Sequence, residues 1–282
     1  MEKLLEVKDL KVSFFTDLGE TQAVKDAGFA IEEGDFFGIV GESGSGKSVT
    51  TKSILRLGPS NCRIMGGEIL FQGEDILKKS EAELREIRGG EIAMIFQDSL
   101  SALNPVYTVG NKMVELIRRH TSMTKKEAKA RVLELLTAVG ITDPEKAMRS
   151  YPHELSGGMR QRVMIAMAMS SNPKVLIADE PTTALDVTIQ AQILHLLLEL
   201  QKKNNMSIIL ITHDLGVVAQ TCKRVAVMCG GYVVEEGTVE EIFLNPGHPY
   251  TQALIASMPR VGGTFEQFLE RDLSDGSGNL CP

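Results

Sequence analysis

The sequence contains no tryptophan, no long apolar run and no excess of positive charge. A helix that crosses a bilayer needs roughly 18 or more apolar residues, so we expect no transmembrane segment. The N-terminal residues carry charges throughout, and we expect no signal peptide there. With a formal net charge of −7, the chain also lacks the basic footprint of a general nucleic-acid binder, so nucleic acid is not expected as a partner.

Cysteine is scarce and scattered, at Cys62, Cys222, Cys229 and Cys281. These positions fit neither metal-knuckle nor disulfide-framework spacing, which is typical of unpaired thiols in a reducing compartment and indicates a cytosolic protein. The remaining composition is ordinary for a globular chain, with 43% hydrophobic and 24% charged residues. A chain of 282 residues is long enough for one large domain with an inserted or appended lobe.

Short apolar runs predict the strands of the core. They lie at residues 36–40, 92–96, 175–178, 208–211 and 225–228. Each run is too continuous to alternate and too short for a helix, which is typical of a strand buried on both faces. Helical patterns lie between them, such as the apolar stripe of Ile189, Ile193 and Leu197. This alternation predicts an α/β fold with a mostly parallel sheet covered on both faces.

Two further features divide the chain. Residues 5–14 and 23–31 flank a polar turn and predict an N-terminal antiparallel β subdomain. Residues 110–140 are helical in composition and lie between predicted strands, which predicts a helical subdomain inserted into the sheet domain. We therefore expect a core with its β subdomain at residues 1–98 and 171–240, a helical subdomain at 99–170 and a C-terminal extension at 241–282.

A phosphate-binding motif follows the first apolar run. Residues 41–48 read Gly-Glu-Ser-Gly-Ser-Gly-Lys-Ser and fit the pattern GxxxxGK[ST], between a predicted strand and a predicted helix. The glycines let successive backbone N–H groups turn toward phosphate oxygens, and the helix N-terminus adds its dipole. We expect Lys47 to neutralise the β and γ phosphates and Ser48 to bind Mg²⁺. The residues expected to hold the nucleotide here are Gly41, Ser43, Gly44, Ser45, Gly46, Lys47, Ser48 and Val49.

A second predicted strand ends in two carboxylates, Asp179 and Glu180. Because side chains alternate along a strand, the two acids are expected to have different roles. We expect Asp179 to hold Mg²⁺, through water, and Glu180 to accept the proton of the water that attacks the γ-phosphate. The alternative, an acid pair that is merely solvated, is disfavoured by the phosphate-binding motif.

Two other apolar runs end in a polar residue, Gln97 and His213. In an open parallel sheet, ligands bind outside the carboxyl ends of the strands. Both side chains are therefore expected to meet the nucleotide and to act in catalysis together with Glu180.

Residues 155–161, Leu-Ser-Gly-Gly-Met-Arg-Gln, resemble the LSGGQ signature of the ATP-binding-cassette family, with Met159 in place of the usual glutamine. Ser156 is expected to cap a helix, and Gly157 and Gly158 allow close backbone approach, which makes an anion site. The resemblance implies a P-loop NTPase of RecA-like fold that uses ATP and Mg²⁺. It also implies that two cassettes dimerise, so that the signature of one closes over the γ-phosphate held by the other.

The resemblance covers nearly the whole chain and implies further roles by position. Gln97 resembles the Q-loop glutamine, a metal ligand, and the segment Ala184-Leu185-Asp186 resembles the D-loop, with Asp186 near the nucleotide. His213 resembles the switch histidine that contacts the γ-phosphate. The aromatic residue that stacks on adenine is expected at the end of the first strand, where Phe14 is the first choice and Phe15 the second.

Local likenesses point to one branch of the family, the importers of dipeptides, oligopeptides and nickel. They are Glu42, Met159, the segment 99–105 and the segment 245–251, Asn-Pro-Gly-His-Pro-Tyr-Thr. The chain most resembles the D-type ATPase subunit of that branch. This implies a peripheral protein at the cytoplasmic face of the cell membrane. The implied partners are a second ATPase subunit, identical or different, two membrane permease subunits that contact residues 98–140, and indirectly an extracytoplasmic solute-binding protein.

The solute stays open, because the binding protein and the permeases select it. Peptide is the first choice, and nickel or a metal chelate is the second. A soluble cassette ATPase acting on ribosomes, DNA or cofactor assembly is disfavoured, because such proteins usually carry two cassettes or a long coiled-coil insertion. A regulatory cassette without hydrolysis is disfavoured by the complete set of Lys47, Asp179, Glu180 and His213.

Overall fold

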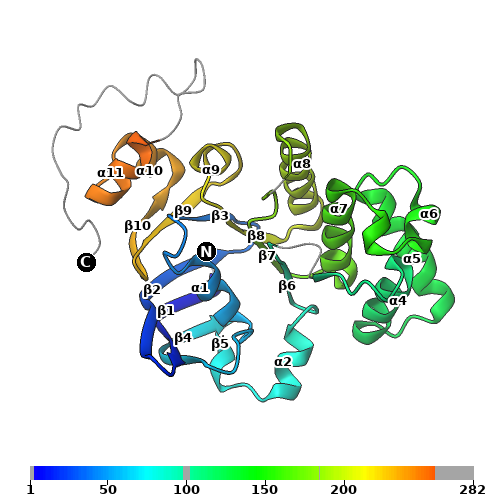
Figure 1. Cartoon of the computed structure of the whole chain (residues 1–282), viewed down its shortest axis with the longest axis horizontal. Helices are drawn as coiled ribbons and strands as arrows, with labels where there is room; N and C mark the ends of the chain where they lie inside the picture. The colour runs from blue at the N-terminus through cyan, green and yellow to red at the C-terminus, as the bar shows by residue number, and fades with distance from the viewer. Residues whose placement is uncertain (1–2, 98–101, 184, 258–282) are drawn as a thin grey trace. The chain divides into compact units, whose positions relative to one another are not determined.

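A computed structural model of the chain describes residues 3–97, 102–183 and 185–257 (Figure 1). Ala184 of the expected D-loop and part of the segment 99–105 lie outside the described residues. The chain forms two compact units, one made of Met1–Lys79 with Ile209–Pro282 and the other of Ser80–Ile208. The domain boundaries expected from the sequence stay a prediction.

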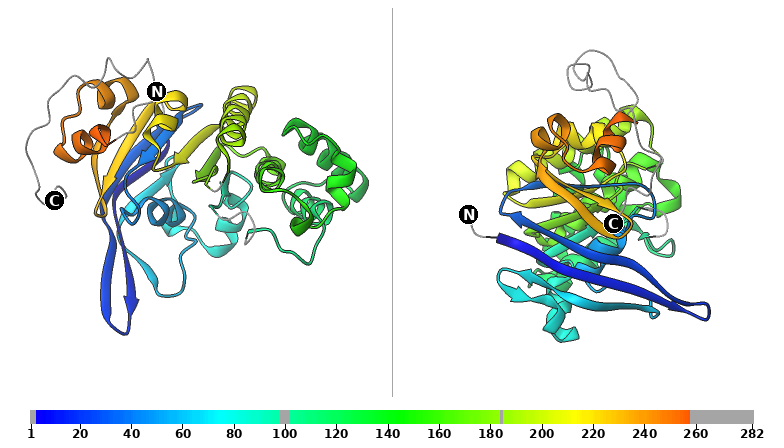
Figure 2. Two further views of the ribbon diagram at one scale, coloured as in Figure 1. Left: turned by 45° about the horizontal axis from the view of Figure 1, so that its top comes forward. Right: turned by 90° about the vertical axis from the view of Figure 1, so that its left-hand side faces the viewer.

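The first unit begins with an antiparallel β region. Strand β1 (Lys3–Thr16) pairs antiparallel with β2 (Gly19–Glu32) on one side and β4 (Cys62–Phe71) on the other, and β5 (Glu74–Asp75) follows β4. Figure 2 shows β1 and β2 as a long hairpin. Leu5, Val7, Leu10 and Val12 of β1 are buried. The antiparallel subdomain expected from the sequence is therefore confirmed, and β4 is a strand that the sequence reading did not single out.

The same unit contains buried strands that run in parallel. Strand β3 (Phe36–Val40) pairs in parallel with β9 (Arg224–Cys229), and β10 (Tyr232–Thr238) pairs antiparallel with β9 and meets β2. Strand β8 (Ser207–Ile211), which belongs to this unit from Ile209 on, lies beside β3. The predicted runs at 36–40 and 225–228 are fully buried, as expected.

Short helices complete the first unit. They are α1 (Lys47–Ile54), the single turn η1 (Ile76–Lys78), α9 (Leu215–Thr221), α10 (Val239–Leu244) and α11 (Pro249–Ala256). Helix α9 packs closely on β3, because a Cβ at Gly38 would lie 3.1 Å from Val218 and 3.2 Å from the sulfur of Cys222. Cys62 and Cys222 are free thiols, as expected, but Cys229 is bonded in a disulfide, which its spacing did not predict.

The second unit contains a parallel strand pair and a helical lobe. Strand β6 (Ile92–Ile95) pairs in parallel with β7 (Val175–Asp179), and α2 (Glu81–Ile87) precedes β6. Between the two strands the chain forms α4 (Val109–His120), α5 (Lys125–Ala138), α6 (Pro144–Arg149), η2 (Pro152–Glu154), α7 (Gly157–Ala168) and η3 (Met169–Ser171). Helix α8 (Val187–Asn204) follows β7. An inserted helical lobe is therefore confirmed.

Apolar stripes hold this lobe together. Met113 and Ile117 of α4, Val132 and Leu136 of α5, and Val163 and Ala166 of α7 have no exposed surface. Their spacing of three or four residues places them on one face of each helix. Within the described residues, no helix is both long enough and apolar enough to cross a membrane.

Candidate functional site

The phosphate-binding loop joins β3 to α1 and requires glycine at two places. At Gly41 the backbone has φ of +150°, and a Cβ would lie 2.1 Å from the carbonyl oxygen of Met228. At Gly46 φ is +103°, and a Cβ would lie 2.7 Å from the carbonyl oxygen of Ala23. Any other residue would collide with the neighbouring backbone at either position. The loop is therefore packed tightly against β9 and the middle of β2.

Lys47 curls back over this loop from the first turn of α1. Its Nζ donates hydrogen bonds to the carbonyl oxygens of Gly41 at 2.6 Å and Glu42 at 2.7 Å, and it lies 3.4 Å from Ser45 Oγ. The lysine is only 5% exposed although it carries a charge, and such burial requires partners of this kind. The cation is thus held above the loop, where the phosphates of a nucleotide are expected. Ser48 follows it on α1 and is half-buried.

Two contacts from the C-terminal part of the chain hold the loop, and the sequence reading did not predict either. The Gly231 N–H, in the turn between β9 and β10, donates to the Ser45 carbonyl oxygen at 3.0 Å. The hydroxyl oxygen of Tyr250, on α11, accepts a hydrogen bond from the Glu42 N–H at 3.1 Å. Burial raises the pKa of Tyr250, so the hydroxyl stays protonated at neutral pH. The motif at 245–251, which contains Tyr250, was the sequence signal for the second of these contacts.

The acid pair lies at the end of β7 in the second unit. Asp179 is fully buried and is the last residue of the strand. Glu180 is half-buried and has φ of +47°, the left-handed region that residues other than glycine seldom adopt. The strand ends immediately before this residue. Such strain is common at functional sites.

Gln97 contacts Glu180 directly. Its Nε2 donates to Glu180 Oε2 at 2.9 Å, and Thr183 Oγ1 donates to the same oxygen at 2.9 Å. Because β6 and β7 are neighbours and parallel, the residues that follow them meet at one edge. Gln97 and Glu180 are therefore in contact at one edge of the strand pair, and their meeting with the nucleotide stays a prediction. Thr183 is a contact of the carboxylate that the sequence reading missed.

The signature segment forms the start of α7. Ser156 is exposed, and its Oγ accepts the Met159 N–H at 3.3 Å as the predicted cap. A Cβ at Gly158 would lie 3.0 Å from Cγ2 of Ile189 in the first turn of α8, so glycine permits close packing there. Asp186 caps α8 by accepting the Ile189 N–H at 2.9 Å. Two capped helix N-termini therefore lie side by side, and their N–H groups and dipoles favour an anion.

The remaining predicted residues belong to the first unit. His213 follows β8 and is exposed, and Asp214 after it caps α9. Phe14 lies near the end of β1, opposite Thr21 of β2 and Cys62 of β4, and is half-buried. The guanidinium of Arg63 lies 5.1 Å from the ring centroid of Phe15. Phe14 stays the first choice and Phe15 the second choice for stacking on adenine.

The predicted site residues thus form two groups, one in each unit. The phosphate-binding loop, Phe14 and His213 lie in the unit that contains β3 and β8, and Ser43 and Gly44 are exposed in the middle of the loop. The second unit holds the residues predicted to act in catalysis or to form the signature and D-loop, which are Gln97, Asp179, Glu180, Ser156, Gly157, Gly158 and Asp186.

Comparisons with known proteins identify the family. The sequence model of the ABC transporter family matches residues 24–183, and the oligopeptide/dipeptide transporter C-terminal region matches residues 234–273. The oligopeptide transport ATP-binding protein OppD of Bacillus subtilis (strain 168) is 56% identical over 268 residues, which cover 95% of this chain and 75% of that protein. The dipeptide transport ATP-binding protein DppD of the same strain is 54% identical, covering 93% and 78%.

A solved structure of an ATP-binding cassette has the same fold as this chain. A dimeric ATP-binding cassette in a post-hydrolysis state, bound to ADP and Pi, superposes with a TM-score of 0.75 at 29% identity, covering 83% of this chain and 98% of that chain. The α/β fold predicted from the strand and helix pattern is therefore confirmed. The chain belongs to the ABC transporter family, in which it is an ATP-binding and ATP-hydrolysing subunit.

Proposed function

We propose that this chain energises the import of dipeptides or oligopeptides, together with a second ATPase subunit on two membrane permease subunits. One observation carries the choice of solute, the match of residues 234–273 to the C-terminal region of oligopeptide and dipeptide transporters. The names of the OppD and DppD relatives agree with it. Nickel or a metal chelate, the second choice from the sequence, has no such support.

The first unit binds the nucleotide in this proposal. Phe14 stacks on adenine, the N–H groups of the loop from Gly41 to Val49 hold the phosphates, and Lys47 neutralises them. Lys47 supports this assignment, because its amine already lies over the loop carbonyl groups. His213, exposed after β8, contacts the γ-phosphate.

The second unit supplies hydrolysis. Glu180 accepts the proton of the attacking water, and Gln97 orients the carboxylate and the water by its amide. The 2.9 Å hydrogen bond between these two side chains supports the pairing. When the carboxylate has taken the proton, the hydroxyl of Thr183 holds it in place.

The oxygen donors of the chain fit Mg²⁺. That ion is usually held by one or two carboxylates together with substrate phosphates. Asp179 is a buried carboxylate and Ser48 offers a hydroxyl, and Gln97 adds an amide oxygen. Among the described residues, no cluster of three or more acidic, histidine or cysteine side chains forms a dedicated metal cage. When bound, Mg²⁺ stabilises the charge that develops on the phosphates.

A second cassette completes the site. The signature residues Ser156, Gly157 and Gly158 and the D-loop residue Asp186 stand at two helix N-termini with Ser156 and Asp186 exposed, so they are accessible to the γ-phosphate held by another subunit. The relative that was solved as a dimer supports such pairing. Binding of ATP joins the two subunits head to tail, and hydrolysis lets them separate. The partner is identical or a different ATPase subunit.

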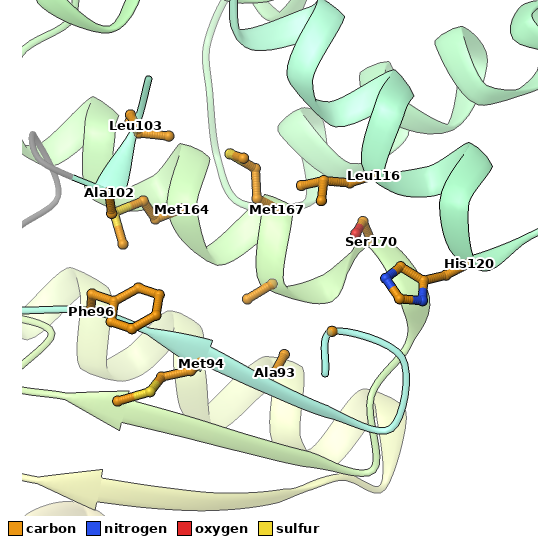
Figure 3. Close-up of a pocket in the computed structure, with 12 residues that line it drawn as sticks. Ala93, Met94, Phe96, Ala102, Leu103, Leu116, His120, Met164, Met167 and Ser170 are labelled. Carbon is orange, nitrogen blue, oxygen red and sulfur yellow. The ribbon is translucent and has the colours of Figure 1, made fainter. Parts of the chain in front are cut away.

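The permease docks beside Gln97. A cavity of ≈ 220 Å³ lies between β6, α4 and α7, and its lining is mostly apolar (Figure 3). Phe96, the neighbour of Gln97, projects into it with Leu116, Met164 and Met167. Methionine side chains adapt to the shape of a partner. We assign to this cavity an apolar side chain from a cytoplasmic helix of the permease, which places the chain at the cytoplasmic face of the membrane.

Uptake by reconstituted vesicles tests the solute. The chain is co-purified with its permeases and second ATPase subunit, and vesicles with the solute-binding protein are given ATP and either labelled peptides of two to six residues or labelled nickel. The proposal expects ATP-dependent uptake of peptide and none of nickel. Uptake of nickel alone, or an ATPase that co-purifies with no membrane protein, would overturn it.

A further inference from the structure

The C-terminal segment that follows β10 is fixed by a short hydrogen-bond relay. The carboxylate of Glu235, on β10, accepts the Gly247 N–H at 2.6 Å and the His248 N–H at 3.1 Å. Nδ1 of His248 in turn accepts the Tyr250 N–H at 3.1 Å and caps α11. Pro249 occupies the first turn of the helix, where its fixed φ is favourable. The position of Tyr250 is therefore set by β10 rather than by α11 alone.

The buried tyrosine reaches the phosphate-binding loop at its first peptide group. Tyr250 is 5% exposed, and its hydroxyl oxygen accepts the Glu42 N–H. The carbonyl of the same peptide group belongs to Gly41, and it accepts a hydrogen bond from Lys47 Nζ at 2.6 Å. One peptide plane is thus held at both edges, by a lysine on one side and a tyrosine on the other.

Of Lys47 and Tyr250, only Lys47 is also expected to bind the nucleotide. An ammonium group has three hydrogens, and those of Lys47 are directed at Gly41, Glu42 and Ser45. Phosphate oxygens compete for the same hydrogens when ATP binds. The Tyr250 hydroxyl faces the backbone N–H and is not subject to that competition. The orientation of the Gly41–Glu42 peptide therefore depends more on Tyr250 when ATP is bound than when ATP is absent.

We infer that Tyr250 is a positioning residue of the ATP site, whose hydroxyl holds the Gly41–Glu42 peptide in the orientation that phosphate binding requires. The inference rests on ATP binding by the loop and is independent of the transported solute. It gives the C-terminal region a role at the nucleotide, since the Gly231 N–H from the adjoining turn holds the Ser45 carbonyl in the same way.

Replacing Tyr250 by phenylalanine removes the hydroxyl and keeps the ring. In the full-length chain, Tyr250→Phe is expected to raise the Kd for ATP about two- to tenfold, the effect of losing one hydrogen bond. The KM for ATP of the assembled transporter is expected to rise by the same factor, while kcat at saturating ATP stays within about twofold. Because the hydrogen bond also exists without nucleotide, the melting temperature of the nucleotide-free chain is expected to fall by about 2–4 °C, and its rise on adding ATP is expected to be smaller than the parental rise.

Tyr232→Phe, on β10 of the same unit, is the matched control and is expected to leave the Kd for ATP unchanged, because the substitution keeps the ring, over which Lys25 Nζ lies at 5.2 Å from the centroid. An unchanged Kd in Tyr250→Phe would overturn the inference. So would a rise of the variant's melting temperature on adding ATP that equals the parental rise, because the hydroxyl would then serve only the fold.

Discussion

At the scale of single residues, Glu180 has a backbone conformation that no sequence pattern revealed. The identity of the acid followed from its place after a buried strand, and so did that of Gln97. The left-handed φ of Glu180 and the hydroxyl of Thr183 depend on how the chain leaves β7. Tertiary contacts decide such conformations, so the sequence pattern indicated which residues stand at the strand ends but not these contacts.

Cys222 gives a prediction about stability at alkaline pH. Burial raises the pKa of its thiol from 9.0 to about 12. The unfolded chain therefore loses the thiol proton above pH 9 while the folded chain keeps it, so this contribution to stability is complete below pH 9 and decreases as the pH rises toward 12. Between pH 8 and pH 10 the loss amounts to about 1.4 kcal/mol.

Urea denaturation of the parent and of Cys222→Ala, under reducing conditions at both pH values, measures this term. The free energy of unfolding of the parent is expected to decrease by about 1.4 kcal/mol more than that of the variant, because all other titrating groups are shared. Any cost of the smaller side chain is the same at both pH values. Equal decreases in the two proteins would show that the thiol is not buried in solution.

At the scale of elements, local signals account for most of what the sequence predicted. Continuous apolar runs located β3, β6, β7, β8 and β9, each within two residues of its observed ends. Helix α2 was missed although Ser80 and Glu83 form a capping box at its start, a signal readable from the sequence. Strand β4 was missed for a physical reason, because most of its first seven residues are exposed or half-buried and show no apolar run.

The N-terminus of α7 provides a prediction at this scale. Ser156→Ala removes the cap of the signature helix and is expected to lower the free energy of unfolding by about 1 kcal/mol. If the same hydroxyl also meets the γ-phosphate of a partner subunit, ATP hydrolysis by the assembled transporter decreases by about tenfold or more. Chemical denaturation and steady-state ATPase rates measure the two effects.

Thr124→Ala is the matched control, because Thr124 caps α5 in the same unit with the same kind of bond. It is expected to cost similar stability and to leave the ATPase rate near the parental value. Equal losses of activity in the two variants would mean that Ser156 serves only as a cap.

At the scale of the whole molecule, two stretches of sequence indicate the family and its branch. The signature at residues 155–161 and the motif at 245–251 agree with the matches at 24–183 and 234–273. The link between the C-terminal region and the ATP site was not predictable, because Glu42 and Tyr250 are 208 residues apart. Only the folded chain places them in contact.

The cavity lined by Phe96, Leu116, Met164 and Met167, which we assign to the permease, gives a prediction for the assembled transporter. Leu116→Glu places a charge in the apolar lining and is expected to abolish stimulation of the ATPase by the permeases, because burying an unpaired carboxylate against a partner is costly. Binding of ATP to the isolated chain is expected to stay near the parental value. Pull-down with the permeases and ATPase assays in vesicles provide the measurements.

Met123→Glu serves as the control, since Met123 is 37% exposed in the same unit and does not line the cavity. Its association with the permeases is expected to match the parent. Normal permease binding by Leu116→Glu would place the docking surface elsewhere.

Glu180 is the proposed base of ATP hydrolysis by this chain. The most direct measurement compares ATP binding and ATP hydrolysis by the assembled transporter carrying either the parental chain or Glu180→Gln. The amide keeps the size of the side chain and its contact with Gln97 but cannot accept the proton. The variant is expected to bind ATP with parental affinity and to hydrolyse it more slowly by on the order of a hundredfold or more. Hydrolysis at the parental rate would remove Glu180 from this role, and a parental chain that binds ATP without hydrolysing it would contradict the whole account.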